Sequence, residues 1–333
     1  MRFEELHLEK SKLHCPFDKS AFNMFFSLVD YRNNYFTSND PEKIIEFYDG
    51  FDNRDQLIQW MSERPKGVHT IYEVEGDNDI IVVIPTADYN GKYAKECRDN
   101  IFKGLHIIFV ESKGDYYFNY AHNCNVGIKK AMEYTPKWIV VSNDDMYKID
   151  DCSILVYELR NKDSKRVNAI FTPPSRYHSV PLCVGKARFT IVKDIARCFF
   201  WFLWDRINLD FHLTAAGIKR RFGVKWGSFP LRGLHTKLLD SESKCLILTS
   251  DFSILSGKWV AELSGNVFNE IYINGVEDWQ LSVESCSNEK NYDFIDYKIG
   301  DLIGTTLGMN SARILRDIVN YVFFDKMMQE KFT

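Results

Sequence analysis

Three short apolar runs rich in β-branched residues constrain the fold of this 333-residue chain more than any other feature. They are IIVVIPT at 80–86, LHIIFVES at 105–112 and WIVV at 138–141, and segments with helical spacing separate them at 91–104 and 119–135. Strands that alternate with helices pair in parallel, and runs that are apolar throughout are typical of strands covered on both faces. The sequence therefore predicts an α/β, Rossmann-like fold with a mostly parallel sheet flanked by helices.

The same patterning divides the chain into a central domain with an addition at each end. We expect a mostly helical extension over residues 1–78, the α/β domain over 79–290, and a helical segment over 291–333 that packs back on the core. The domain divides at residue 150 into halves at 79–150 and 151–290. Further helices are expected over 21–31, 41–51, 54–64, 151–167 and 312–328, and further strands over 69–76 and 168–175.

Polar side chains follow each of the three apolar runs. They are Thr86, Asp88 and Asn90 after the first, Glu111 and Ser112 at the second, and Asp144 and Asp145 after the third. Because the carboxyl ends of parallel strands lie at one edge of the sheet, where such folds bind ligands, we expect these groups to meet there. The glycine-rich dinucleotide fingerprint and the Walker loop are missing, so a nucleotide would be held by side chains, single backbone groups and a metal.

The adjacent pair Asp144 and Asp145 has two interpretations. Neighbouring carboxylates repel each other unless a cation or a donor-rich ligand lies between them, and hard oxygen ligands suit Mg²⁺ or Mn²⁺ beside ligand phosphates. The alternative is a solvated turn that caps the helix after it. For an isolated pair the turn is the more common interpretation, and the motifs elsewhere in the chain shift the balance toward the first.

Composition narrows the classes of partner. The net charge of −4 gives no electrostatic basis for nucleic-acid binding, and no stretch approaches the roughly 18–20 apolar residues of a membrane span. The 8 cysteines form no CxxC pair and no Cys/His ligand spacing. Since the sequence also opens without a signal peptide, we expect buried thiols and a cytoplasmic protein.

Five motifs of the central domain occur in the order IIVVIPT, Tyr89–Asn90, LHIIFVES, NYAHNCNVGI and WIVVSNDD. Together they resemble family 2 glycosyltransferases of the GT-A fold. In that family a Pro-Thr turn ends the first strand, an acidic residue ends the second, an Asn-x-Gly-Ile helix follows, and a DxD-type motif binds a metal. The chain departs from this pattern in three places: Ala87 and Asp88 are inserted, Glu111 replaces an aspartate, and Asn143 occupies the first DxD position.

A second acidic pair, Glu277 and Asp278, lies in the segment 254–284. Taken alone, such a pair is more often on the protein surface than catalytic. Here it follows a small-residue turn, Val-Phe-Asn-Glu and a short aromatic stretch, and it opens Glu-Asp-x-x-Leu. This segment resembles the second signature of the same family, in which the ED pair starts a helix beneath the acceptor. A helix N-terminus also stabilises a carboxylate.

The resemblance implies transfer of a sugar from a nucleotide-diphosphate sugar, bound by 79–150, to a hydroxyl of a glycan, glycoprotein or lipid-linked acceptor, bound by 151–290. It implies Mn²⁺ or Mg²⁺ on Asp145 and a catalytic base at Asp278, with Glu277 positioning the acceptor or serving in its place. One base without an enzyme nucleophile gives single displacement with inversion. The residues implied in nucleotide-sugar binding are Pro85, Thr86, Asp88, Glu111, Asn125 and Asp144.

Two other functions match parts of the sequence. A sugar-nucleotide nucleotidyltransferase also has a parallel sheet and paired carboxylates, but TADYNGKY at 86–93 matches its Gly- and Lys/Arg-rich loop poorly. A catalytically inactive glycan-binding domain of the same fold is consistent with the altered DxD motif. It is also consistent with the lack of any histidine after His235, because some GT-A enzymes use a late histidine as a metal ligand.

The segment 191–207, IVKDIARCFFWFLWDRI, is dense in large aromatic residues and carries basic residues. One interpretation is a helix buried against the sheet. The other is an interfacial surface that makes peripheral contact with a membrane holding a lipid-linked acceptor. The basic run KRRFGVKW at 219–226 either contacts an anionic lipid, glycan or diphosphate or lies on a solvated face.

Overall fold

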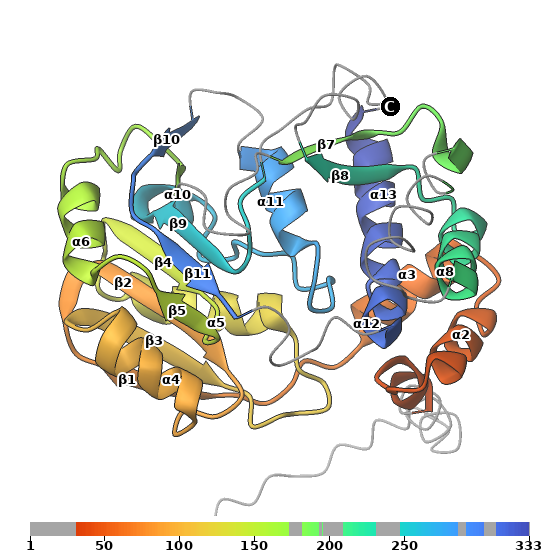
Figure 1. The fold of residues 1–333 in the computed structure, drawn as a ribbon, viewed down its shortest axis with the longest axis horizontal. Helices are drawn as coiled ribbons and strands as arrows, with labels where there is room; N and C mark the ends of the chain where they lie inside the picture. The colour runs from red at the N-terminus through yellow and green to blue at the C-terminus, as the bar shows by residue number, and fades with distance from the viewer. Residues whose placement is uncertain are drawn as a thin grey trace, which may run out of the picture.

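The computed structural model describes residues 31–172, 182–192, 195, 209–230, 247–285, 291–302 and 311–332. A central sheet with helices on both faces lies beside a second group of helices (Figure 1). The sheet confirms the expected α/β class with a mostly parallel sheet. Most of the segment 21–31, where we expected the first helix, lies outside the described residues.

The sheet has seven strands in the order β1-β3-β2-β4-β9-β6-β10. Their bounds are β1 Thr70–Val74, β2 Asp77–Thr86, β3 Leu105–Glu111, β4 Trp138–Ser142, β6 Ala169–Phe171, β9 Phe252–Ser256 and β10 Tyr292–Phe294. Strands β3, β2 and β4 pair in parallel, as do β6 and β10, whereas β1 is antiparallel to β3 and β9 is antiparallel to both neighbours. The three apolar runs are thus strands, and the expected edge strand is β1. The antiparallel β9 was not predicted.

Helices cover both faces of this sheet. They are α4 Lys92–Glu96, which continues into a π-helical turn at Cys97–Ile101, α5 Tyr120–Met132, α6 Cys152–Arg160 and α10 Gly257–Glu262. Alternate residues of β2 point to opposite faces, as the pleat of a strand requires. Ile80, Val82 and Ile84 pack on the face with α4 and α6, and Ile81 and Val83 pack on the face with α5 and α10. Burial on both faces explains why the part of β2 from Ile80 to Pro85 is apolar throughout.

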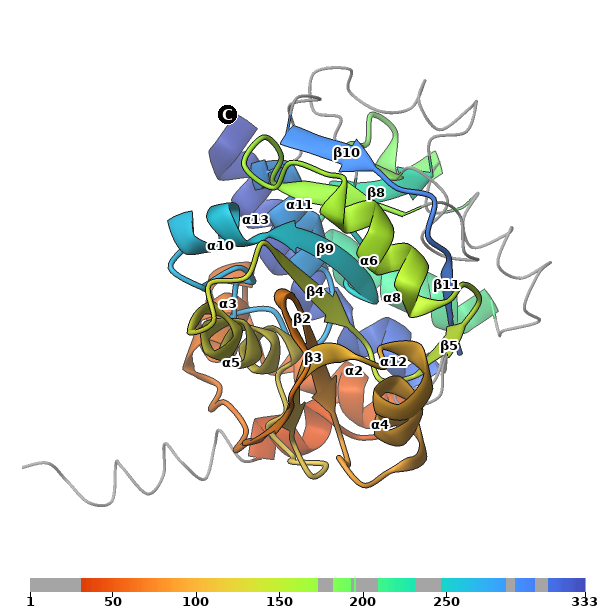
Figure 2. The ribbon, with the colours of Figure 1, turned by 90° about the vertical axis from the view of Figure 1, so that its left-hand side faces the viewer.

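The remaining helices form a second core beside the sheet. They are α2 Pro41–Asp49, α3 Arg54–Glu63, α8 Leu209–Arg221, α11 Glu277–Ser285, α12 Ser311–Arg316 and α13 Ile318–Phe332, with the hairpin of β7 Leu182–Lys186 and β8 Trp226–Pro230. This core contains residues from the N-terminal, middle and C-terminal parts of the chain, so the two expected additions pack together. In Figure 2 these helices lie behind the sheet.

The pairing of β4 with β9 sets the geometry of the sheet at its centre. Ser142 is opposite Phe252 at one end, and Trp138 is opposite Ser256 at the other. Directly after β9, the backbone N–H of Gly257 donates to the carbonyl of Lys137 over 2.9 Å. A Cβ atom at residue 257 would lie 1.9 Å from the carbonyl oxygen of Pro136. Only glycine therefore allows the chain to turn into α10 this close to the start of β4.

Substitution of Gly257 tests this close approach. We expect Gly257→Ala to lower the free energy of unfolding by about 2–3 kcal/mol, because the obstructing atom belongs to the backbone and cannot rotate away. The matched control is Gly217→Ala in α8, where nothing lies within 4 Å of the new Cβ. That substitution should raise stability by roughly 0.5–1 kcal/mol. Urea unfolding of both variants is the measurement, and equal stabilities would contradict the proposed packing.

Candidate active site

The carboxyl ends of β2 and β4 meet through a buried hydrogen bond. Thr86, the last residue of β2, donates from Oγ1 to Oδ2 of Asp144 over 2.6 Å. Burial raises the pKa of Asp144 above its usual range, the hydrogen bond from Thr86 opposes this shift, and the charge of Asp145 adds to it. Both aspartates are buried. Thr86 and Asp144 therefore lie together at the strand edge where we expected them.

The acidic end of β3 holds the loop after β2. The backbone N–H of Tyr89 donates to Oε1 of Glu111 over 3.0 Å, and the hydroxyl of Tyr72 donates to Oε2 over 3.4 Å. The rings of Tyr72 and Tyr89 stack with centroids 4.2 Å apart. Asp88 is exposed, and its carboxylate caps the turn by accepting from the N–H of Asn90. The inserted loop thus lies against Glu111.

A four-residue segment joins the two acidic pairs of the chain. Because β9 runs antiparallel to β4, the residues before β9 lie at the carboxyl end of β4. There, the backbone N–H of Asn143 donates to the carbonyl of Asp251 over 2.9 Å, and its side-chain amide donates to the carboxylate of Asp251 over 3.2 Å. One residue earlier, the N–H of Ser250 donates to Oδ2 of Asp278 over 3.2 Å. The segment 250–251 therefore connects the residue before Asp144 to Asp278.

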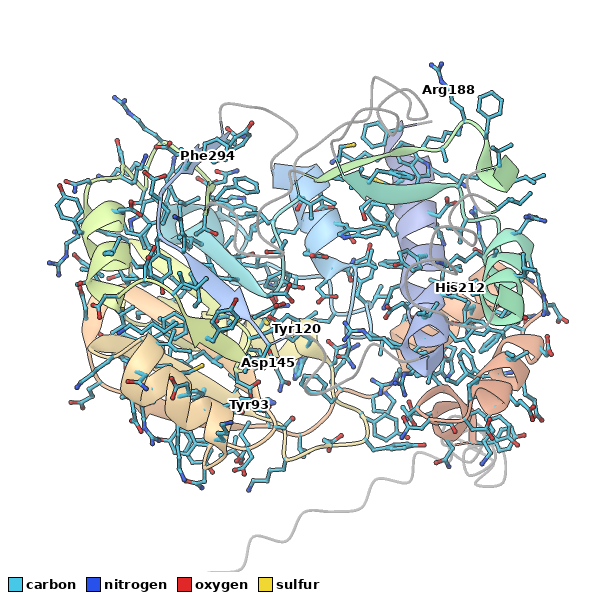
Figure 3. All side chains as sticks on the ribbon, viewed as in Figure 1. Tyr93, Tyr120, Asp145, Arg188, His212 and Phe294 are labelled. Carbon is cyan, nitrogen blue, oxygen red and sulfur yellow. The ribbon has the colours of Figure 1, made fainter. Side chains whose placement is uncertain are left out.

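One further contact attaches α11 to the same segment, and another attaches α5 to it. Ser282 accepts from the N–H of Leu248 over 2.8 Å and donates to the carbonyl of Asp278 over 2.6 Å. From α5, the hydroxyl of Tyr120 donates to the carbonyl of Ser250 over 2.7 Å. Asp145 and Tyr120 lie where the sheet meets the second core (Figure 3). The segment 248–251 is thus held from β4, α5 and α11.

Glu277 and Asp278 begin α11, as the sequence predicted. The residue before them, Val276, has a φ of 72°, which is strained for a β-branched side chain. Such strain is most often found at functional sites. The carboxylate of Glu277 is only 2% exposed, and its Oε2 has no hydrogen-bond partner among the described residues. A buried acceptor left without a donor is unusual in a stable structure and requires an explanation.

We call Asp144, Asp145, Asp251, Glu277 and Asp278 the acidic cluster. Burial and the charges of Asp301 and Asp145 raise the pKa of Asp251 to about 6. Burial and the charges of Glu277 and Asp251 raise the pKa of Asp278 well above its usual range. Burial raises the pKa of Glu277 to about 7, and Arg313 opposes this shift. The cluster therefore has carboxyl groups that exchange protons near neutral pH, as acid–base catalysis requires.

The other residues expected in the site have different surroundings. Asn125 of α5 is buried, and its amide donates to the carbonyl of Phe268 over 2.7 Å and to Glu270 over 3.0 Å, while its oxygen accepts from the N–H of Phe268. Its hydrogen bonds thus hold the loop before α11 and not the end of β4. Pro85 is a buried residue of β2 opposite Val110.

Asp251 is a member of the cluster that the sequence did not reveal. It directly follows the segment 176–250, which is the least readable part of the sequence, and it directly precedes the unpredicted β9. Most of 191–207 lies outside the described residues, and its described residues Ile191, Val192 and Ile195 are exposed. The basic run at 219–226 includes the end of α8 and the start of β8.

The acidic cluster has oxygen ligands suited to a divalent cation, but they are not arranged as a complete set. No group of three or more His, Cys, Asp or Glu side chains in the described parts of the chain is placed to hold a metal ion. Mg²⁺ is usually bound by one or two carboxylates together with substrate phosphates and water, which fits a single ligand at Asp145. At Asn143, an aspartate would repel Asp251, whereas the amide donates to it.

Comparisons with protein-family models, with curated proteins and with solved structures gave no match for this chain. Within the described ranges, every helix is too short or too polar to cross a bilayer.

The pKa of Glu277 predicts how stability depends on pH. A carboxyl group whose pKa is raised from 4.5 to about 7 by folding binds more protons in the folded than in the unfolded state between these pH values. Stability therefore falls as the pH rises through this window. Glu277→Gln cannot ionise, so we expect the loss of unfolding free energy between pH 5 and pH 8 to shrink by roughly 2–3 kcal/mol. Urea unfolding at each pH is the measurement.

The control for this experiment is Glu262→Gln in α10, whose side chain is 59% exposed. It should leave the pH dependence of stability unchanged. If Glu277→Gln shows the same pH dependence as the unsubstituted protein, the carboxyl is ionised throughout and the described burial is wrong.

Proposed function

We propose that this protein is an inverting glycosyltransferase of GT-A type that transfers a sugar from a nucleotide-diphosphate sugar to an acceptor hydroxyl. One observation supports this more than any other. The segment 250–251 contacts Asn143, beside Asp144 and Asp145, and also contacts Asp278. Glycosyl transfer requires a group that receives the donor diphosphate and a base that deprotonates the acceptor close to each other, and these residues provide both chemistries.

Asp278 is the proposed catalytic base. Its raised pKa makes it a stronger proton acceptor than an ordinary aspartate, and the N–H of Ser250 stabilises its ionised form. As the acceptor oxygen attacks the anomeric carbon, its proton passes to Asp278 and the bond to the nucleoside diphosphate breaks. No nucleophile of the enzyme is needed, so the configuration at the anomeric carbon inverts. Glu277, with its buried Oε2, positions the acceptor hydroxyl by accepting a hydrogen bond from it.

The donor is proposed to bind at the ends of β2, β3 and β4. Asp144, held by Thr86, accepts hydrogen bonds from the ribose hydroxyls. Glu111 accepts a hydrogen bond from the base, beside the stacked ring of Tyr89. Donor binding is also proposed for Pro85, Asp88 and Asn125. Asp88 and Asn125 already bind neighbouring backbone or side-chain groups, so they have fewer free positions for a donor. Mn²⁺ or Mg²⁺ on Asp145 would offset the negative charge of the leaving diphosphate.

The acceptor is proposed to be a glycan, a glycoprotein or a lipid-linked glycan. Exposed apolar residues at Phe189, Ile191, Val192 and Ile195 support peripheral contact with a membrane that holds such a lipid. Flotation with anionic liposomes distinguishes the lipid-linked acceptor from the other two. Only a protein that contacts the membrane moves to the vesicle layer.

Removal of the proposed base tests the reaction. Asp278→Asn should lower kcat by about 10²–10⁴-fold, since the amide cannot accept the proton, while donor binding is retained. The control Asp163→Asn changes an exposed aspartate of the same kind and should leave kcat unchanged. Transfer is followed by release of the nucleoside diphosphate, and NMR of the product gives the anomeric configuration. Full activity of Asp278→Asn, or retention of configuration, would refute the proposed mechanism.

Nucleotide binding is tested separately from turnover. UDP, GDP, dTDP and CMP, each with Mn²⁺, are compared for their effect on Tm. At a hundredfold excess over its Kd, the cognate nucleotide should stabilise the protein by about 2.7 kcal/mol. Asp145→Asn should lose the part of this stabilisation that depends on Mn²⁺, whereas Asp163→Asn should keep it. A protein that no nucleotide stabilises, with or without Mn²⁺, would not be a nucleotide-sugar enzyme.

A further inference from the structure

A pocket lies beside α11, one helical turn from Glu277 of the acidic cluster. Its volume is about 360 Å³, near the lower end of the roughly 300–1,000 Å³ typical of small-molecule sites. It is lined by α5, by the loop 266–270 and by α11. On α11, the lining residues Gln280, Leu281 and Glu284 share a face with Glu277, which lies one turn before them, whereas Asp278 is directed away from Gln280. The pocket therefore begins one turn of α11 from Glu277, and Asp278 is not part of its lining.

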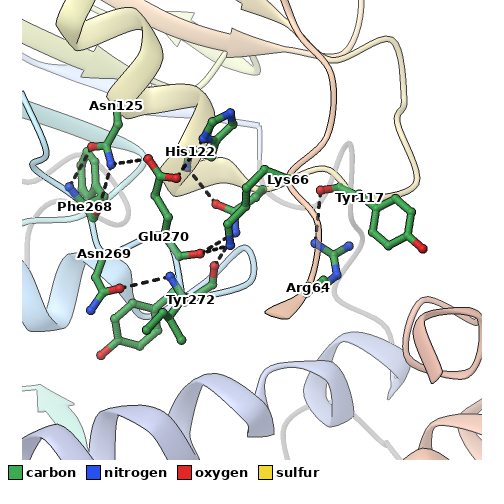
Figure 4. A network of polar contacts seen from close by, with 11 residues as sticks. Arg64, Lys66, Tyr117, His122, Asn125, Phe268, Asn269, Glu270 and Tyr272 are labelled. Carbon is green, nitrogen blue, oxygen red and sulfur yellow. Dashed lines mark hydrogen bonds and ion pairs between the residues drawn. The ribbon is translucent and has the colours of Figure 1, made fainter. Parts of the chain in front are cut away.

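Polar side chains surround the pocket. Asn269 donates to Gln280 over 3.2 Å, and Gln280 in turn donates to Glu284 over 2.7 Å. On the other wall, Glu270 accepts from Asn125 over 3.0 Å and lies 2.9 Å from Nδ1 of His122. Figure 4 shows the carboxylate of Glu270 directed from the loop toward the side chains of Asn125 and His122 on α5. Two carboxylates and several amides therefore line one small space.

The loop that forms this wall is held rigidly. Asn125 pairs with both the N–H and the carbonyl of Phe268. Asn119 donates to the carbonyls of Glu270 and Tyr272 over 3.0 and 2.8 Å, and Lys66 also donates to the carbonyl of Glu270. Because groups of the protein hold this loop, the lining side chains are positioned by the fold itself, which lowers the entropic cost of binding.

The hydrogen-bonding capacity of the lining selects the ligand. Burial alone would raise the pKa of Glu270, but hydrogen bonds from Asn125 and His122 outweigh it, and the pKa lies below its usual range. The oxygens of Glu270 and Glu284 supply a surplus of acceptor lone pairs, while Asn269 and Gln280 each keep one amide hydrogen to donate. A phosphate would be repelled by two carboxylates. The described residues offer no metal-binding group.

We propose that this pocket binds an uncharged sugar unit through its hydroxyl groups, as a carbohydrate site one helical turn from the acidic cluster. Hydroxyls donate to the carboxylates and accept from the amides, which matches the lining on both counts. The proposal does not depend on the proposed transfer reaction. A glycan bound there would lie along the face of α11 that begins at Glu277.

Saturation-transfer NMR with the full chain tests this site. The probes are methyl α-D-glucopyranoside, methyl α-D-mannopyranoside and methyl α-D-galactopyranoside. We expect saturation transfer to at least one of them and a loss of affinity of at least about tenfold in Glu284→Ala, which removes an acceptor from an exposed side chain. Asn266→Trp puts a large ring on the exposed residue of the lining and should also abolish transfer. Circular dichroism confirms that each variant is folded.

Asp163→Asn is the matched control, because it changes an exposed aspartate that does not line the pocket and should bind the glycoside normally. Excess UDP with Mn²⁺ should likewise leave the signal unchanged. The proposal fails if no glycoside receives saturation, if the signal survives in both pocket variants, or if UDP removes it. Glycoside binding without donor turnover in the unsubstituted protein would refute only the proposed function.

Discussion

The antiparallel pairing of β4 with β9 brings together the two acidic parts of this chain. In a sheet of parallel strands only, the residues before β9 would lie at the opposite edge from Asp144 and Asp145. Because β9 is reversed, Ser250 and Asp251 lie at the carboxyl end of β4 and accept or donate the hydrogen bonds that connect it to α11. The glycine after β9 permits this pairing to continue into α10 without a steric clash.

Sequence patterns predicted the strands and helix ends that depend on residues close together in the chain. Runs such as 80–86 are strands because both faces are buried, and Glu277 starts a helix because an acidic residue suits a helix N-terminus. The strand β9 could not be predicted in the same way. Its five residues, Phe252–Ser256, are short, begin next to a polar turn and end at the N-cap of α10. Their direction in the sheet depends on a partner more than a hundred residues away in the chain.

The role of a residue also depends on which partners reach it. Asn125 has the residue type and helix position that the resemblance implies, yet its amide is saturated by Phe268 and Glu270. Asp251 has no motif around it, yet it contacts Asn143 and raises the pKa of Asp278. In the same way, helices from both ends of the chain form one core. An apolar helix face predicts that the face is buried, but it does not predict which element packs against it.

The acidic cluster places carboxylates in surroundings that oppose their ionisation. Burial raises the pKa of Asp144, Asp251, Glu277 and Asp278, and each neighbouring carboxylate increases the effect where it is close. Such a group of acids is less stable when ionised than when protonated, and the strained backbone at Val276 adds to the unfavourable energy. A ligand that brings positive charge or several hydrogen-bond donors would lower these pKa values and release protons. The acidic cluster is therefore more stable with such a ligand bound than in the free protein.

Helix α5 gives both faces of α11 a common support. Its first turn holds the reaction side, since the hydroxyl of Tyr120 donates to Ser250 and its N–H donates to Asn274, three residues before Glu277. Its second turn holds the pocket side through Asn125. Because α5 packs directly on β2 and β3, both regions are fixed to the most buried part of the sheet. A ligand in the pocket would thus meet a helix whose two faces cannot move independently, which couples the position of Gln280 to that of Asp278.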